Sequence, residues 1–172
     1  MSEKQYIPRL EDQVCFPFYA ISKLLSKVYM PHLKKIDLTY TQYLVMMVLW
    51  EKDNIKVNEI GERIFLESNT LTPLINKLIK KEYITKKRSE NDERVVLIKL
   101  TQRGDELKNI AHCVPFGINE SLQVTPGEAA ELRSLLWAFF DRIVKGNNLK
   151  IKNHNAKPLT PEEPNTNQGP KS

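Results

Sequence analysis

Apolar positions recur at helical spacing along most of the first 145 residues and predict a mainly helical fold. The first such stretch runs from about Val14 to Met30. Pro17 fits its first turn, and Pro31 is expected to bend or end it. A second helix is expected to begin after Thr41 and to reach Trp50. Because this helix is apolar on most of its faces, we expect it at the centre of the fold.

The segment between Val57 and Thr101 has a different pattern. Two short helical stretches, KVNEIGERIF and the run after it, are joined by a tight turn at about Phe65–Glu67, and Ser68 or Asn69 is expected to be the second helix's N-cap. The strand-like runs ITKKR and RVVLIKL follow, separated by the polar loop SENDE, and they predict a β-hairpin. Two short helices followed by a hairpin indicate a winged helix–turn–helix.

The remaining pattern predicts two more helices and a tail. One helix starts near Thr101 and continues to about Cys113, where Pro115 and Gly117 are expected to interrupt it. Another starts at VTPGE, with Pro126 near its first position. From residue 146 onward Asn, Pro and Lys dominate, so residues 146–172 are expected to be disordered.

These elements indicate one domain over residues 1–145, of mainly α (α+β) class. The winged helix–turn–helix would occupy about residues 41–101, between helices over about 10–38 and 103–145. Those flanking helices are long and apolar on one side. Such helices often pack against a second copy, which predicts a homodimer.

Charge is concentrated in the same region as the hairpin. The whole chain carries a net charge of +5, and the segment Leu74–Arg103 alone contains nine basic and four acidic residues. A run of lysines by itself also fits a solvated face. The combination of helix–turn–helix, basic hairpin and clustered charge favours double-stranded DNA as the partner, with binding that weakens steeply with salt.

The expected DNA contacts lie on the second helix and on the hairpin. In a helix–turn–helix the N-terminal half of the second helix reaches base edges in the major groove. Arg94 is expected to enter the adjacent minor groove, with Asp92 holding its guanidinium; the alternative is an ordinary surface arginine. The full set is Ser68, Asn69, Thr70, Thr72, Pro73, Asn76, Lys77, Arg88, Asp92 and Arg94.

Composition argues against several other classes of protein. No apolar run approaches the roughly 20 residues that cross a bilayer, and the polar start MSEKQYIPRLED differs from a secretory signal, so a cytoplasmic location without membrane attachment is expected. Two cysteines, Cys15 and Cys113, do not form a disulfide framework in a reducing compartment. The three histidines show no metal-ligand spacing, and neither a metal nor a cofactor is expected.

The hairpin sequence NDERVVLIKLTQRG resembles the signature of the MarR family, D-x-R-x-x-x-x-x-L-T-x-x-G, with Asp92, Arg94, Leu100, Thr101 and Gly104 at the defined positions. The resemblance covers roughly residues 10–145. It implies a winged-helix homodimer, with the first and last helices as the dimerisation layer. It also implies repression by occupying a near-palindromic operator.

Within that family the N-terminal third resembles the organic hydroperoxide resistance regulators (OhrR-like proteins). The resemblance rests on LEDQVCFPFYAISKLLSKVYMPHLKKIDLTYTQYLVMMVLWE. It implies that Cys15 is a peroxide-sensing thiol, that Tyr29 and Tyr40 hydrogen-bond to it across the dimer interface, and that organic hydroperoxides are the inducers. In some relatives a second, later thiol forms an intersubunit disulfide, and Cys113 is the candidate for that role here. Other relatives use a small-molecule thiol instead, and this alternative stays open.

The chemistry around Cys15 agrees with that resemblance. The partial positive charge at a helix N-terminus and hydrogen bonds from tyrosine hydroxyls both favour a thiolate. Nearby aromatic residues, among them Tyr19, suit an organic hydroperoxide better than hydrogen peroxide. By composition alone Cys15 would more often be a small buried hydrophobe than a sensor, and the spacing of the tyrosines reverses this preference. Interface packing is the alternative role for Tyr29 and Tyr40.

Two alternatives stay open. A MarR-type repressor could respond to a small aromatic ligand held between the dimer layer and the wing domain, with Cys15 passive. A thiol-dependent peroxidase would fit a reactive cysteine, but the chain has no C-x-x-C and no acid–base constellation around Cys15. The sequence therefore predicts a regulator rather than an enzyme.

Overall fold

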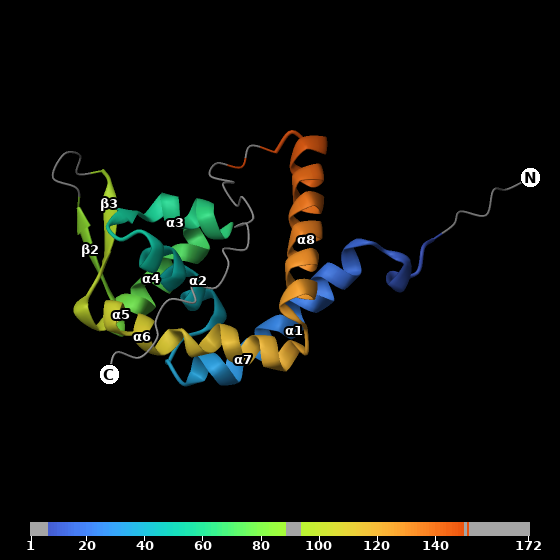
Figure 1. The fold of residues 1–172 in the computed structure, drawn as a ribbon. Helices are drawn as coiled ribbons and strands as arrows, with labels where there is room; N and C mark the ends of the chain where they lie inside the picture. The colour runs from blue at the N-terminus through green and yellow to red at the C-terminus, as the bar shows by residue number, and fades with distance from the viewer. Residues whose placement is uncertain (1–6, 89–93, 150, 152–172) are drawn as a thin grey trace, which may run out of the picture. The chain divides into compact units, whose positions relative to one another are not determined.

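The computed structural model describes residues 7–88, 94–149 and 151, and these residues form a mainly helical fold with a small sheet, as predicted (Figure 1). The chain divides into two compact units, Met1–Gln123 and Val124–Ser172. The first unit contains the described elements η1 (Leu10–Asp12), α1 (Cys15–Lys34), α2 (Tyr40–Glu51), β1 (Ile55–Lys56), α3 (Val57–Ile64), α4 (Ser68–Lys80), β2 (Ile84–Arg88), β3 (Val96–Leu100), α5 (Gln102–Glu106), α6 (Lys108–Ala111) and α7 (Cys113–Leu122).

The second unit contains helix α8 (Pro126–Gly146). Its start agrees with the prediction, because Pro126 is at the first position and Thr125 and Glu128 form a capping box. The predicted disordered tail falls almost entirely outside the described residues. One domain ending near residue 145 stays a prediction. No helix among the described residues is long and apolar enough to cross a membrane.

Helix α2 is central to the core of the first unit, as its apolar pattern predicts. Val45, Met46 and Leu49 are at most 1% exposed. The helix begins at Tyr40, not after Thr41, because Thr39 is its N-cap. The Thr39 hydroxyl accepts a hydrogen bond from the Gln42 backbone N–H, and the Gln42 side chain accepts one from the Thr39 N–H.

Helix α1 does not end at Pro31 but continues to Lys34. The helix predicted from Thr101 to about Cys113 divides into α5 and α6 and ends at Ala111, close to the predicted point, but Pro115 and Gly117 lie inside the next helix, α7, and do not interrupt it. Pro115 is the third residue of α7, where a missing N–H leaves no intrahelical bond unmade. At Pro31 one hydrogen bond is lost, but Leu33, two residues later, is 1% exposed, and its burial stabilises the last turn.

The hairpin belongs to a three-stranded sheet in the described part of the chain. Strands β2 and β3 pair antiparallel as predicted, and β1 adds to the other edge of β3, with Ile55 opposite Ile98. Strand β1 was not predicted, because two residues are too few to form an alternating pattern. Ile55, Ile84 and Ile98 are buried and join the sheet to the core.

Helices α3 and α4 form the predicted helix–turn–helix, joined by a tight turn. Phe65 ends α3 in the left-handed region with φ 56°, and the Leu66 N–H donates back to Gly61 O. A Cβ on Gly61 would lie 2.7 Å from Leu66 O, so the turn requires glycine there. Glu67 is the N-cap of α4, not Ser68 or Asn69 as predicted; it makes no side-chain cap bond, and Ser68 is the first helical residue.

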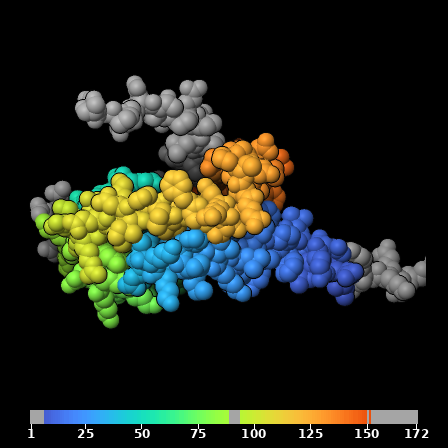
Figure 2. All heavy atoms as spheres, turned by 60° about the horizontal axis from the view of Figure 1, so that its bottom comes forward, coloured from blue at the N-terminus to red at the C-terminus, as the bar shows by residue number. Residues whose placement is uncertain are grey.

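Helices α1 and α7 lie side by side in the first unit (Figures 1 and 2). The imidazole Nε2 of His32 is 3.3 Å from Ser121 Oγ, and the His32 ring lies over Gly117, which has no Cβ to obstruct it. The N-terminal half of α1 extends beyond α7. Apolar side chains on that half are exposed, including Val14 at 70%, Ile21 at 54% and Leu24 at 58%.

Candidate nucleic-acid interface and thiol site

Helix α4 has a polar surface and an apolar face, divided as the sequence pattern predicts. The apolar face is buried at Leu71, Ile75 and Leu78. The predicted contact residues on this helix are all exposed: Ser68, Asn69, Thr70, Thr72, Pro73, Asn76 and Lys77. A helix with one face buried against its scaffold and a row of short polar side chains on the other can enter a DNA groove without losing its support.

The hairpin extends this polar surface with cations. Arg88 is exposed at the end of β2, and Arg94 is exposed just before β3. Asp92, the predicted partner of Arg94, lies outside the described residues. Two of the basic residues in this region are engaged elsewhere: Lys81 pairs with Asp37 at 2.8 Å, and Arg103 pairs with Glu82 at 3.3 Å.

The end of the hairpin motif, Leu100-Thr101-x-x-Gly104, is structural. The Thr101 hydroxyl accepts a hydrogen bond from the Gly104 N–H and donates one to Glu82 O at 2.6 Å. A Cβ on Gly104 would lie 1.9 Å from Tyr83 O, so only glycine permits this close approach. Trp50 Nε1 donates to Gly104 O at 2.9 Å. This junction ties the end of α4, the end of β3 and the end of α2 together.

Cys15 is the first residue of α1 and is exposed. Its thiol is therefore accessible to a peroxide. Tyr19, one turn further along α1, is 62% exposed, with the Lys23 ammonium 5.5 Å from its ring centroid. Within one chain, Cys15 and Tyr19 thus lie on an open helix end.

Tyr29 and Tyr40 lie together, far from Cys15 of the same chain. Their ring centroids are 4.8 Å apart. Tyr29 is fourteen residues after Cys15 on a continuous helix, which at about 1.5 Å per residue separates them by about 21 Å. A single chain does not bring the predicted thiol and its predicted hydroxyl partners into contact.

A third tyrosine, which the sequence analysis did not select, completes this cluster. Tyr43 is 5% exposed, and its ring centroid is 6.4 Å from that of Tyr29 and 6.1 Å from that of Trp50. The spacing Tyr40–Tyr43 is i, i+3 on a helix, a signal that places both on one face.

The three phenols are held in their protonated form. Burial raises the pKa of Tyr29, with the nearby Tyr40 adding to the effect, and burial also raises the pKa of Tyr40. Burial is likewise the main reason that the pKa of Tyr43 is raised; Tyr29, Cys113 and Tyr40 add to it. At neutral pH each hydroxyl is therefore a hydrogen-bond donor, which is what a thiolate or an alkoxide requires.

Cys113 lies beside this cluster, at the start of α7, and is exposed. It is close enough for its charge to act on the Tyr43 hydroxyl. A disulfide needs Cα atoms within about 7 Å of each other. Because Cys15 lies about 21 Å along α1 from the tyrosines that Cys113 adjoins, the two cysteines of one chain are not positioned to bond to each other.

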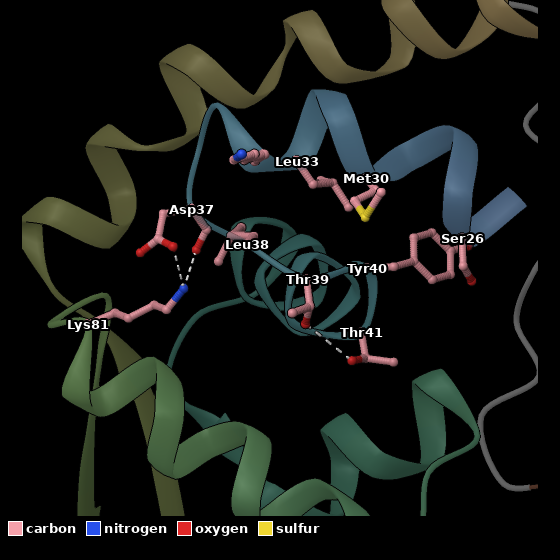
Figure 3. Close-up of a pocket in the computed structure, with 10 residues that line it drawn as sticks. Ser26, Met30, Leu33, Asp37, Leu38, Thr39, Tyr40, Thr41 and Lys81 are labelled. Atoms are coloured by element: carbon pink, nitrogen blue, oxygen red, sulfur yellow. Dashed lines mark hydrogen bonds and ion pairs between the residues drawn. The ribbon is translucent and has the colours of Figure 1, made fainter.

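A pocket of about 530 Å³ opens next to Tyr40 (Figure 3). Met30 and Leu33 of α1 and Leu38 of the following loop contribute apolar surface, and Tyr40 comes from α2. Lys81, at the end of α4, reaches across and pairs with Asp37. The pocket thus lies between α1 and the helix–turn–helix, and its size is in the range of small-molecule sites.

Comparison with known proteins places the chain among transcriptional regulators. Residues 27–110 match the family model described as transcriptional regulator SarA/Rot. The chain is 39% identical over 139 residues to the organic hydroperoxide resistance transcriptional regulator of Bacillus subtilis, covering 81% of this chain and 95% of that protein. It is also 39% identical over 140 residues to the HTH-type transcriptional regulator SarZ of Staphylococcus epidermidis, covering 79% and 95% respectively.

A similar solved protein is AbfR of Staphylococcus epidermidis. The structure of reduced AbfR bound to DNA shares 30% identity with a TM-score of 0.65, covering 83% of this chain and 97% of that chain. The structure of AbfR with a disulfide formed shares 33% identity with a TM-score of 0.55, covering 77% of this chain and 93% of that one.

Proposed function

Because the chain belongs to the MarR family of winged-helix transcriptional regulators, in its organic hydroperoxide resistance (OhrR-like) subgroup, we propose that it is a homodimeric repressor released from DNA when an organic hydroperoxide oxidises Cys15. It is a DNA-binding regulator rather than an enzyme, and it would act in the cytoplasm on a near-palindromic operator. The reduced dimer would bind the operator, and the oxidised dimer would leave it.

The observation that carries this proposal is the separation of the thiol from its hydrogen-bond donors. Cys15 lies at an open helix end, and the protonated hydroxyls of Tyr29 and Tyr40 lie about 21 Å along the same helix. Two copies of α1 packed antiparallel would bring Cys15 of one chain to the tyrosines of the other. The exposed apolar residues on the N-terminal half of α1 are the surface such packing would bury.

Oxidation of Cys15 would take place in two steps. The Cys15 thiolate attacks the terminal oxygen of ROOH, the O–O bond breaks, and the alkoxide leaves as ROH after taking up a proton. Sulfur loses two electrons to the peroxide and becomes a sulfenic acid. A Cys113 thiolate from the other chain can then attack this sulfur. An S–S bond forms, the S–O bond breaks, and the oxygen leaves as hydroxide, which takes up a proton from solvent to give water.

A run of contacts links the tyrosine cluster to the DNA-reading unit. The Tyr43 ring meets the edge of Trp50, whose indole N–H donates to Gly104 O. The Thr101 hydroxyl accepts a hydrogen bond from the Gly104 N–H and donates one to Glu82 O, just after α4. Movement of the tyrosines on oxidation would therefore shift the junction that supports both α4 and the wing.

Substitution of Cys15 by serine tests the proposal. Cys15→Ser protein should bind operator duplex with the affinity of the unmodified protein and should remain bound after addition of cumene hydroperoxide. The matched control is Cys113→Ser, which keeps the first oxidation step. Release of Cys15→Ser protein by hydroperoxide would refute sensing by this thiol.

The pocket beside Tyr40 favours a second candidate function. Its apolar lining and the ammonium groups of Lys34 and Lys81, the latter paired with Asp37, suit a small aromatic acid. Binding of such an acid between α1 and the helix–turn–helix would release DNA with Cys15 passive. In that case salicylate would dissociate the complex in the presence of dithiothreitol, and Leu38→Trp, which fills the pocket, would abolish the effect. If salicylate has no effect under these conditions, the ligand-responsive function is refuted and only the redox function remains.

A further inference from the structure

A cleft of about 290 Å³ separates the N-terminal end of α4 from the wing. Its polar lining comes from five segments, namely β1, α3, α4, β2 and the residues that lead into β3. The side chains concerned are Lys56, Asn58, Ser68, Thr72, Lys86 and Arg94.

Lys56 and Lys86 reach the cleft from the two edge strands of the sheet, β1 and β2. Side chains along a strand alternate between the two faces of the sheet, and Lys86 shares the face of the buried Ile84. Lys56 has Leu97 as its register partner, as does Lys87, so Lys56 leaves the sheet on the face opposite to Lys86. The two lysines therefore line the cleft from opposite edges and opposite faces of the sheet.

The cleft has the electrostatic character of an anion site. It has three cationic side chains, and none of its described lining residues is acidic. Within the described part of the chain, no ion pair engages Lys56 or Lys86. The first turns of α3 and α4 both open into the cleft through Asn58 and Ser68, and each carries the partial positive charge of a helix N-terminus. Like charges that line one cleft repel each other, and an anion bound between them would offset this repulsion.

The arrangement of the two reading elements identifies the anion. When α4 lies in a major groove and the hairpin reaches the adjacent minor groove, the sugar–phosphate strand that divides these grooves must pass between them. The cleft lies between the same two elements. We propose that it seats a backbone phosphate of this strand, held by Lys56 and Lys86 and by the polar groups at the start of α4.

This inference rests on the proposed DNA-binding function and adds three contacts that the sequence pattern did not indicate, Lys56, Asn58 and Lys86. A phosphate contact carries no base information. The cleft therefore sets how α4 and the wing straddle the backbone, and it contributes equally to operator and non-operator duplexes. Sequence discrimination stays with the exposed face of α4.

The test is the salt dependence of DNA binding by the full-length protein. Fluorescence anisotropy with a labelled operator duplex and a scrambled duplex would be measured over a range of KCl concentrations for Lys56→Gln/Lys86→Gln. Both lysines are exposed, so the fold is not at risk. The control is Lys27→Gln/Lys35→Gln, which removes the same charge from exposed positions in the C-terminal half of α1 and directly after it. A third variant, Asn76→Ala, alters the reading face alone.

The double variant in the cleft should reduce the steepness of log K against log salt by about one to two. It should also weaken binding of the operator duplex and of the scrambled duplex by the same factor. The control should leave the slope unchanged, and Asn76→Ala should reduce only the preference for operator. A slope equal to that of the control, or a loss confined to operator, would overturn the inference. A second result would also overturn it. If calorimetry showed that the unmodified protein binds inorganic phosphate tightly, and the double variant lost this binding without any change in the salt slope of DNA binding, the cleft would serve a free anion. An unmodified protein that binds neither duplex would instead contradict the proposed function itself.

Discussion

Replacement of Gly104 by alanine places a methyl group against the backbone of Tyr83. The new Cβ would lie 1.9 Å from Tyr83 O, 2.8 Å from its carbonyl carbon and 3.2 Å from its Cα. All three neighbours are backbone atoms, so no side-chain rotation relieves the clash. The two segments must separate by about 1 Å before the contact reaches the 3.0 Å that real Cβ atoms respect.

Three hydrogen bonds cross this junction and would be stretched by that separation. They are Trp50 Nε1 to Gly104 O at 2.9 Å, Thr101 N to Tyr83 O at 3.0 Å and Thr101 Oγ1 to Glu82 O at 2.6 Å. Each stretched bond should cost about 1 kcal/mol, and overpacking should cost a further 1–3 kcal/mol, roughly. Alanine is more favourable than glycine in a helix by about 1 kcal/mol, which offsets part of this loss. The free energy of unfolding should therefore fall by about 3–5 kcal/mol.

Urea unfolding followed by tryptophan fluorescence measures this change, at one fixed protein concentration because the stability of a dimer depends on concentration. Gly146→Ala is the matched control, since its Cβ would meet nothing within 4 Å, and it should shift the free energy by no more than about 1 kcal/mol. A Gly104→Ala protein within about 1 kcal/mol of the unmodified protein would refute the role assigned to this glycine.

Three further outcomes are expected. Gly117→Ala puts a Cβ 2.4 Å from the His32 ring, but this side chain can rotate away, so the free energy of unfolding should fall by only about 1–2 kcal/mol. Adding His32→Ala to this variant should recover most of the loss. No recovery in urea titrations would contradict the contact. Because burial raises the pKa of Tyr29 and Tyr43, the folded state holds their protons more tightly than the unfolded state. Their contribution should be constant below about pH 10 and lost as pH rises above it, and Tyr29→Phe/Tyr43→Phe should show a smaller alkaline loss in unfolding measured from pH 7 to 11. Oxidised protein should run as a covalent dimer in non-reducing electrophoresis and Cys113→Ser as a monomer; a covalent dimer of the variant would argue against resolution by Cys113.

Local sequence signals predicted most of the elements correctly. The helices, the turn after α3 and the hairpin each follow from spacing within a few residues, as does the division of α4 into a buried apolar face and an exposed polar face. The errors arise where the rest of the fold outweighs a local signal. Proline at position 31 loses one hydrogen bond in any helix, but the burial of Leu33 that offsets this loss depends on the rest of the fold.

The candidate sites likewise combine features that follow from neighbouring residues with features that depend on the whole fold. The chain by itself indicates a DNA-reading helix, a basic hairpin and a cysteine at a helix start, because each is a property of neighbouring residues. Only the tertiary structure brings Lys56 to Lys86, thirty residues later, since the pairing of β1 and β2 with β3 joins them. Only the packing of α1 against α2 and of α7 against α1 brings Tyr29 and Cys113 to Tyr43. Spacing along a chain determines which side chains share one face of one element; which faces meet depends on where the whole chain buries its apolar surface.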